Sequence, residues 1–199
     1  VAIQTGYKYA VRNGYDLVVQ IDGDGQHDPK YIKPMIEALL SSESDVVIGS
    51  RFLEGGSYDV PIARKLGIKF FSKIASMITG QKISDSTSGF QVLNRNAFKF
   101  FSKAENFPYD YPDADTIITL IFARFRVKEV PVIMYDRMNG TSMTTGLNTI
   151  FYVIKMLISI LITVLRKRNI YKESEEFCGS DFINNGHNLA ETSTLKMLH

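Results

Sequence analysis

An apolar strand pattern that ends in two closely spaced carboxylates is the feature that most constrains this chain. The run Leu-Val-Val-Gln-Ile over residues 17–21 is short and rich in β-branched residues. Such a run is typical of a strand in a parallel sheet that is covered on both faces. Asp22 and Asp24 follow at once, so they should emerge at the carboxyl edge of the sheet, where open α/β folds bind ligands.

Two carboxylates this close repel each other unless a cation lies between them. Hard oxygen ligands suit Mg²⁺ or Mn²⁺, which usually bind a phosphate of the substrate as well. Gly23 and Gly25 allow the backbone to turn tightly beside such a ligand. We therefore predict that Asp22 and Asp24 bind a divalent metal ion.

Other interpretations of the same segment fit less well. An EF-hand loop would need an acid or asparagine at Gln26 and a glutamate at Lys33. A phosphatase-type nucleophile motif would need threonine or serine at Gln26. An acidic turn that caps the next helix explains Asp28, but it leaves Asp22 and Asp24 without a role.

Composition excludes several classes of protein. The 199 residues are 45% hydrophobic and 22% charged, which suits one α/β domain with a sizeable core. The single cysteine, Cys178, excludes an internal disulfide framework and thiol-based zinc sites. Net charge is +2, and residues 169–199 hold two lysines and five acids, which leaves +5 on residues 1–168. That excess suits phosphates or an anionic membrane, and it is too modest for a nucleic-acid partner.

The periodicity of apolar residues predicts alternating helices and strands after the acidic loop. Helices are expected over residues 29–42, 62–79, 96–103 and 113–124, and strands over 45–49, 90–93 and 128–134. In the helix over 62–79, the pattern predicts that Leu66, Phe70, Phe71, Ile74 and Ile78 face the core.

The C-terminal third divides differently. Residues 149–165 are apolar apart from Lys155, Ser159 and Thr163, and three basic residues follow. A membrane-surface helix with a basic end, a marginal transmembrane helix and a core helix all fit, and the surface helix fits best. We expect three parts: a partial catalytic domain over 1–145, a membrane-associated helix over 146–168 and a disordered tail over 169–199.

Four ordered motifs resemble family 2 glycosyltransferases, most closely the dolichol-phosphate mannose synthase branch. They are Asp-Gly-Asp-Gly-Gln-His-Asp-Pro at 22–29, Gly-Ser-Arg-Phe at 49–52, Asp-Ser-Thr-Ser-Gly-Phe at 85–90 and Asp-Arg-Met-Asn-Gly-Thr-Ser at 136–142. The resemblance covers residues 1 to about 165. It implies a GT-A fold, which is an α/β, Rossmann-like, mostly parallel sheet flanked by helices. Because residue 1 opens on a helical pattern, we expect the first strand or strands of that fold to be missing.

The resemblance also implies roles for individual residues. Asp22, Asp24 and Gln26 would bind Mn²⁺ or Mg²⁺, and Asp24 would take part in catalysis. His27 is a neighbouring residue outside this metal set. The substrate-binding set would be Arg51, Arg64, Arg137, Ser142 and Ser88.

A guanidinium after a buried strand can bind phosphate oxygens bidentately, although Arg51 also fits an ordinary surface arginine. Asp85 would be catalytic, facing the sugar or the acceptor; an Asx turn is the alternative. A hydroxyl acceptor would need a general base, for which Asp85, Asp113 and Asp115 are candidates. The last two also fit helix caps.

The resemblance therefore implies a metal-dependent, inverting glycosyltransferase that moves a sugar from a nucleotide-diphosphate donor to a polyprenyl-phosphate-type lipid acceptor. It would act at the cytoplasmic face of a membrane in cell-envelope synthesis, with the membrane surface as a partner. A transferase acting on a sugar hydroxyl and an inactive membrane-bound interaction module are the alternatives. A processive polysaccharide synthase would carry a Gln-x-x-Arg-Trp motif, and this chain has no tryptophan.

Overall fold

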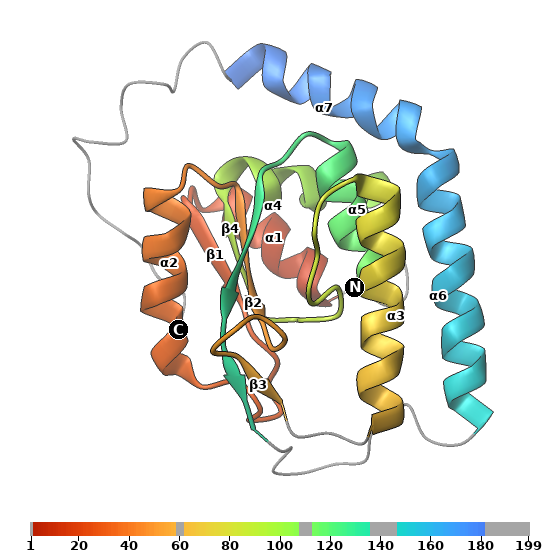
Figure 1. The fold of residues 1–199 in the computed structure, drawn as a ribbon. Coiled ribbons are helices and arrows are strands. Elements are labelled where there is room, and N and C mark those ends of the chain that lie inside the picture. The colour runs from red at the N-terminus through yellow and green to blue at the C-terminus, as the bar shows by residue number, and fades with distance from the viewer. Residues whose placement is uncertain (1, 59–61, 108–112, 136–146, 182–199) are drawn as a thin grey trace.

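The computed structural model describes residues 2–58, 62–107, 113–135 and 147–181. At its centre is a sheet with strand order β1-β4-β2-β5 (Figure 1). Its strands are β1 (Leu17–Gln20), β2 (Val46–Ser50), β4 (Gln91–Asn94) and β5 (Val127–Pro131). A second, two-stranded sheet pairs β3 (Ser57–Tyr58) with β6 (Ile133–Met134).

Three of the four central strands run in the same direction. β2 pairs parallel with β5, whereas β4 runs antiparallel to both β1 and β2. The expected α/β fold is confirmed, and only β4 runs against the other three strands of this sheet. The surroundings of β1 differ from the prediction, because β1 pairs only with the antiparallel β4 and is half-buried along its length. Among the described residues it is an edge strand.

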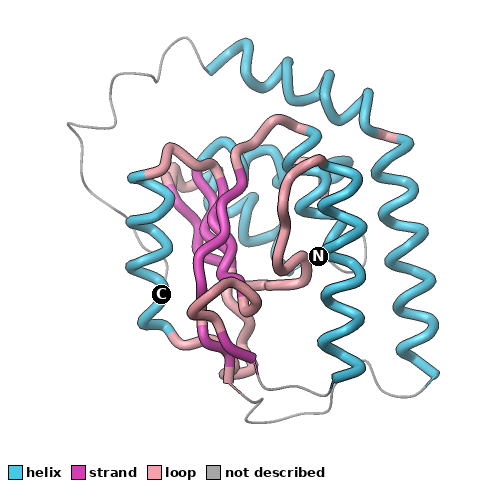
Figure 2. The backbone as a smooth tube through the Cα atoms, in the orientation of Figure 1, coloured by secondary structure: helices cyan, strands magenta, loops and turns pink. Residues whose placement is uncertain are grey.

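Helices cover both faces of the sheet (Figure 2). A hydrophobic core lies on each face. On one face, α2 (Ile32–Ser41), which follows the 3₁₀ turn Pro29–Tyr31, packs Met35 and Leu39 against Val47. The other face carries α1 (Ala2–Arg12), α3 (Ile62–Thr79), α4 (Arg95–Ser102) and α5 (Ala114–Phe122). Every residue of β2 is buried because both of its faces are covered.

The predicted strand over 128–134 is divided in the structure. Pro131 ends β5 at the edge of the central sheet, and the chain continues as β6 in the second sheet. An edge position is where proline is tolerated, because it lacks the N–H that a ladder needs. Pro131 therefore lies at the end of an edge strand of the described sheet.

Helix α3 has its predicted ends but not its predicted orientation. It begins at Ile62 and ends at Thr79, before Gly80 with a φ of 71°. Phe71 is buried, but Leu66 is 61% exposed and Phe70 is 50% exposed. The prediction that these last two face the core is therefore wrong. The spacing of apolar residues predicted the helix correctly. The side of α3 that is buried, however, is the one that carries Ile68, Phe71 and Ala75.

Two further helices lie outside α3 and α5 in Figure 1: α6 (Leu147–Leu165) and α7 (Lys167–Asp181). No helix in the described part of the chain is long and apolar enough to cross a membrane. The structure differs from the disordered tail expected from residue 169, because α7 continues to Asp181. Ile170 and Ser174 are buried on its inner side, and the Arg124 guanidinium lies 5.3 Å from the ring centre of Tyr171.

Candidate functional site

The acidic loop follows the carboxyl end of β1, as predicted. The backbone N–H of Gln26 donates to Asp24 Oδ1 at 3.1 Å, and Gly25 has a φ of 78°, which closes the turn. Asp28 caps the next turn, because its Oδ1 accepts from the N–H of Lys30 at 2.9 Å. The capping interpretation is thus confirmed for Asp28.

The carboxylate of Asp22 lies against the backbone of Gly89, in the loop that precedes β4. A Cβ atom at Gly89 would lie 2.7 Å from Asp22 Oδ2. On its other side, His27 Nε2 is 3.4 Å from Asp22 Oδ2, and the imidazole ring lies 5.1 Å from the ring of Phe90. The His27 side chain is 1% exposed while that of Asp22 is 51% exposed. His27 therefore contacts Asp22 from the protein interior, whereas the Asp22 carboxylate is half exposed to solvent.

The segment after β6 holds the acidic loop in position. Gln26 Nε2 donates to the carbonyl of Tyr135 at 3.0 Å, and the N–H of Tyr135 donates to the carbonyl of Gln26 at 2.9 Å. His27 forms an isolated antiparallel bridge with Met134. These side-chain and backbone contacts fix the acidic loop against the segment that follows β6.

The donor set of this loop fits a hard divalent ion. It offers the carboxylates of Asp22 and Asp24 and the amide oxygen of Gln26, all of which suit Mg²⁺ or Mn²⁺. Within the described residues, no group of three or more His, Cys, Asp or Glu is placed to hold a metal. One or two carboxylates that share the ion with substrate phosphates is the usual arrangement for Mg²⁺. The metal-binding set remains a prediction.

Arg51 and Asp85 form a buried ion pair between the end of β2 and the loop after α3. Arg51 Nε donates to Asp85 Oδ2 and Arg51 Nη2 to Oδ1, both at 2.6 Å. The N–H of Arg51 adds a third bond to Oδ2 at 3.1 Å. Arg51 is 5% exposed and Asp85 is fully buried, so Arg51 is not an ordinary surface arginine. Their predicted contacts with the substrate stay predictions.

Side chains from two other elements hold the loop over residues 83–89. The Glu129 carboxylate on β5 accepts from the N–H groups of Ser84 and Asp85 at 2.8–3.0 Å. From α3, Ser72 Oγ accepts from the N–H of Ser86 at 3.0 Å, and Ser76 Oγ accepts from the N–H of residue 83 at 2.9 Å. Because its backbone donors are satisfied this way, the loop keeps one conformation beside Asp22.

Ser88 makes a structural hydrogen bond in the same loop. Its hydroxyl donates to the carbonyl of Gly49 at 2.6 Å, and the residue is 3% exposed. This bond ties the loop to the end of β2. The contact of Ser88 with a substrate stays a prediction.

Two acids at the start of α5 accept hydrogen bonds from α6. Asp113 occupies the N-cap position but makes no capping bond with its side chain; instead the Tyr152 hydroxyl donates to its carboxylate. Two turns further along α6, the Ser159 hydroxyl donates to Asp115. Asp115 also accepts from the N–H of Thr116 at 2.8 Å. The side chain of Asp113 is therefore held by another helix rather than by its own.

Burial raises the pKa of Asp113 to about 6. The hydrogen bond from Tyr152 opposes this effect, the charge of Asp115 adds to it, and smaller contributions come from Arg51, which lowers the pKa, and Asp22, which raises it. Burial also raises the pKa of Asp115. The Asp113 carboxyl group interacts electrostatically with Asp22 and Arg51. Because its pKa is near neutrality, it is suited to accept a proton.

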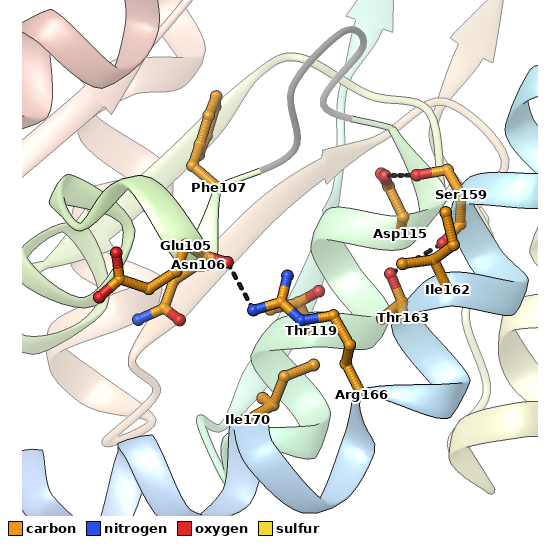
Figure 3. A pocket seen from close by; sticks show the side chains of 10 residues that line it. All are labelled: Glu105, Asn106, Phe107, Asp115, Thr119, Ser159, Ile162, Thr163, Arg166 and Ile170. Atoms are coloured by element: carbon orange, nitrogen blue, oxygen red, sulfur yellow. Dashed lines mark hydrogen bonds between the residues drawn. The ribbon is translucent and has the colours of Figure 1, made fainter.

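A cavity of about 460 Å³ lies between α5 and α6 (Figure 3). Arg166 Nη2 donates to the carbonyl of Glu105 at 2.8 Å across its wall, and Thr163 bonds the carbonyl of Ser159 at 3.0 Å. Its lining consists of Glu105, Asn106, Phe107, Asp115, Thr119, Ser159, Ile162, Thr163, Arg166 and Ile170. The cavity therefore shares Asp115 with the acid pair of α5 but contains none of the predicted metal or phosphate ligands.

Some predicted site residues lie outside the described part of the chain. Arg137 and Ser142 fall within residues 136–146, and the side chain of Arg64 is likewise not described. The sequence reasoning missed Glu129 and Tyr152. Neither belongs to a motif, and only their contacts with distant segments give them a role.

Comparisons with known proteins identify relatives of this chain. The chain is 28% identical over 158 residues to a UDP-N-acetylglucosamine–dolichyl-phosphate N-acetylglucosaminyltransferase of Methanococcus voltae, which covers 77% of this chain and 62% of that protein. It is 28% identical over 144 residues to an undecaprenyl-phosphate mannosyltransferase of Micrococcus luteus, with 71% and 58% covered. It is also 28% identical over 150 residues to a polyprenol monophosphomannose synthase of Mycolicibacterium smegmatis, with 74% and 56% covered.

The matched region thus spans about 56–62% of the length of these relatives. The model of the family described as glycosyl transferase family 2 matches residues 1–101, which is half of the chain. That range contains the acidic loop, the Arg51–Asp85 pair and the loop that packs against Asp22. The chain therefore belongs to glycosyl transferase family 2.

Proposed function

We propose that this chain carries the catalytic domain of a metal-dependent, inverting glycosyltransferase. It transfers a sugar from a nucleotide-diphosphate donor to a polyprenyl-phosphate-type lipid. The observation that carries the proposal is the contact between Asp22 and Gly89, which brings the acidic loop and the Asp-x-x-Ser-Gly-Phe loop to one edge of the sheet. The names of the three relatives, each of which refers to a polyprenyl lipid, support the acceptor class.

The reaction needs few groups from the protein when the acceptor is a phosphate. An anionic acceptor oxygen attacks the anomeric carbon, the bond from that carbon to the donor diphosphate breaks, and the nucleoside diphosphate leaves with the electron pair. When bound by Asp22, Asp24 and Gln26, Mg²⁺ or Mn²⁺ would supply Lewis-acid stabilisation of the leaving diphosphate. The proposed substrate-binding groups are Arg51, Arg64, Arg137, Ser88 and Ser142.

In this proposal the Arg51–Asp85 pair organises the sugar side of the site. Three hydrogen bonds from Arg51 fix the Asp85 carboxylate, and Glu129 fixes its backbone. Groups held this firmly are preorganised for binding, so little ordering is needed when the substrate enters. We propose that the reaction takes place at the cytoplasmic face of a membrane of the cell envelope, because the acceptor is a lipid.

Calorimetric titration with UDP and with GDP, each with and without Mn²⁺, tests the donor site. We expect binding that depends on manganese and is lost in Asp24→Ala but kept in Glu37→Ala, which removes an exposed carboxylate from α2. Binding without any dependence on metal or on Asp24 would contradict the metal assignment. If neither nucleotide binds, the interpretation as an interaction module gains support.

A transferase that acts on a sugar hydroxyl is the second candidate, and Asp113 favours it. A hydroxyl acceptor needs a general base, and a carboxyl group with a pKa of about 6 fits that task. Asp113→Asn separates the two candidates in assays with a short-chain prenyl phosphate and the preferred nucleotide sugar. Transfer that survives the substitution supports the phosphate acceptor, whereas loss of transfer with intact nucleotide binding supports a base.

A further inference from the structure

Two side chains connect helix α1 to the backbone that lies against the acidic loop. The Tyr7 hydroxyl of α1 donates to Gln20 Oε1 at 2.7 Å, and Gln20 Nε2 donates to the carbonyl of Gly89 at 3.1 Å. Gly89 is the residue that contacts the Asp22 carboxylate. The contacts therefore run from α1 through the end of β1 to one of the predicted metal ligands.

The Gly89 carbonyl lies beyond the paired part of the sheet and is bound by a side chain. The pairing of β1 with β4 ends at Gln20 and Gln91, and Gly89 lies two residues before Gln91. Residues that pair directly across two antiparallel strands point to the same face of the sheet. Gln20 Nε2 bonds the carbonyl of Gly89, and Gln91 Nε2 bonds the preceding carbonyl at 3.0 Å. Side-chain amides thus hold this backbone where the pairing of the strands stops.

Only one orientation of the Gln20 amide satisfies both of its neighbours. A carbonyl oxygen accepts a hydrogen bond but cannot donate one, so the amide must direct its NH₂ group toward Gly89. The amide oxygen then faces Tyr7, whose hydroxyl donates to it. In the opposite orientation, two acceptor oxygens would face each other at Gly89. The Tyr7 hydroxyl therefore favours the orientation in which Gln20 binds the glycine.

The surroundings of Tyr7 keep its hydroxyl in place. Tyr7 is 2% exposed, and its ring stacks on that of Phe101 with centres 6.3 Å apart. It also packs edge-to-face with Phe107, with centres 5.8 Å apart. Burial raises the pKa of Tyr7, so the hydroxyl keeps its proton and remains a donor. Aromatic packing thus fixes the group that orients Gln20.

The contacts form a closed ring around the acid. Asp22 follows Gln20 by two residues, its carboxylate lies against Gly89, and the Gly89 carbonyl is bound by the Gln20 side chain. The Asp22 side chain is 51% exposed, so it has room to move toward solvent. A Cβ atom at Gly89 would lie within 3 Å of both of its oxygens. A small shift of the glycine backbone would therefore change the space that is left for the carboxylate.

We propose that Gln20, oriented by Tyr7, is a positioning residue for the divalent-metal site. It holds the backbone of Gly89 where the Asp22 carboxylate can reach the ion. This inference rests on the proposed function, because only that proposal makes Asp22 a metal ligand. Neither Gln20 nor Tyr7 belongs to one of the four motifs, so the motifs gave no signal for either residue.

Titration of the full chain with Mn²⁺ tests this role without any reaction. Free Mn²⁺ gives an electron paramagnetic resonance signal that decreases on binding, which measures the affinity for the metal alone. Calorimetry with UDP or GDP in the presence of Mn²⁺ gives a second measurement. The test variants are Gln20→Met, Tyr7→Phe and the double variant. The matched control is Gln4→Met, because Gln4 donates its amide to a different carbonyl, that of Lys103, at 3.0 Å.

Gln20→Met should lower the affinity for Mn²⁺ by about 10-fold, as when a group that orients a metal ligand is removed. Gln4→Met should leave that affinity unchanged. Tyr7→Phe should lower it by less than Gln20→Met, because an amide without a fixed orientation still binds Gly89 part of the time. In the Gln20→Met background, Tyr7→Phe should have no further effect on the affinity, since Tyr7 acts only through Gln20.

Urea denaturation of the same proteins separates positioning from a purely structural role. A structural role would lower stability and leave the Mn²⁺ affinity of the folded protein unchanged. Wild-type affinity in folded Gln20→Met would therefore overturn the proposal and leave the metal site intact. Additive losses of affinity from Tyr7→Phe and Gln20→Met would contradict the action of Tyr7 through Gln20. A wild-type chain that binds no Mn²⁺ in either measurement would instead contradict the metal assignment of the proposed function, and the positioning role with it.

Discussion

Gly89 and Asp22 are in direct contact, although 66 residues separate them along the chain: a Cβ atom at position 89 would lie 2.7 Å from Asp22 Oδ2 and 2.9 Å from Oδ1. Real Cβ atoms do not approach other heavy atoms this closely, so only glycine leaves the acid in its position. The glycine of the Asp-x-x-Ser-Gly-Phe motif, in the loop before β4, therefore constrains the position of the Asp22 carboxylate.

Gly89→Ala should displace the Asp22 carboxylate without unfolding the protein. Asp22 is half exposed and can swing toward solvent, so the free energy of unfolding should change by less than about 1 kcal/mol. Manganese-dependent nucleotide affinity should fall by about 10-fold or more, as when a neighbour of a metal ligand is altered. Calorimetry measures the affinity, and Gly67→Ala, where a Cβ meets open space, is the control. Unchanged affinity in Gly89→Ala would show that Asp22 does not bind the ion.

The buried Arg51–Asp85 pair should show strong coupling in a double-mutant cycle. Arg51→Met and Asp85→Leu each leave one buried charge without its partner, and each should lower the free energy of unfolding by about 3–5 kcal/mol. The double variant should lose much less than the sum of the two. Urea denaturation of the four proteins measures this coupling. Additive losses would mean that the two charges do not depend on each other in the folded state.

The raised pKa of Asp113 makes stability depend on pH. Its pKa in the folded protein is about 6, above its ordinary value of 3.8, so the folded state binds the proton more tightly than the unfolded state. This contribution is fully present below about pH 4 and is lost as the pH rises through about 6. Asp113→Asn should therefore gain stability relative to the wild type as the pH rises, by up to about 3 kcal/mol.

Urea denaturation between about pH 4 and about pH 8 measures that gain for Asp113→Asn. A constant difference between Asp113→Asn and the wild type across this range would contradict the assigned burial of the carboxylate.

Phe70 and Phe71 should differ sharply although they are neighbours in α3. Phe71→Ala removes a ring that is 3% exposed and should cost about 3–5 kcal/mol of unfolding free energy. Phe70→Ala removes a ring that is 50% exposed and should cost less than about 1 kcal/mol. Thermal and urea denaturation measure both values. Similar losses for the two variants would show that α3 is oriented as its sequence pattern predicted.

Local sequence was enough to predict several of the elements and some of their ends. The run before Asp22 predicted β1, Asp28 predicted the cap that follows, and the apolar period with Gly80 predicted the bounds of α3. These features depend on neighbours within a few residues, such as a capping carboxylate or a glycine at positive φ. The four motifs were likewise enough to indicate the family, because their order along the chain is itself informative.

The sequence by itself determined that two carboxylates follow a strand, since that property is local. Only the tertiary structure decided what surrounds them. Gly89 and His27 contact Asp22, and Arg51 is paired with Asp85 rather than exposed. The same holds for α3: periodicity shows that one side is apolar, but the choice of buried stripe depends on which helices cover the sheet. Burial and pairing are properties of distant segments in contact, and no local pattern records them.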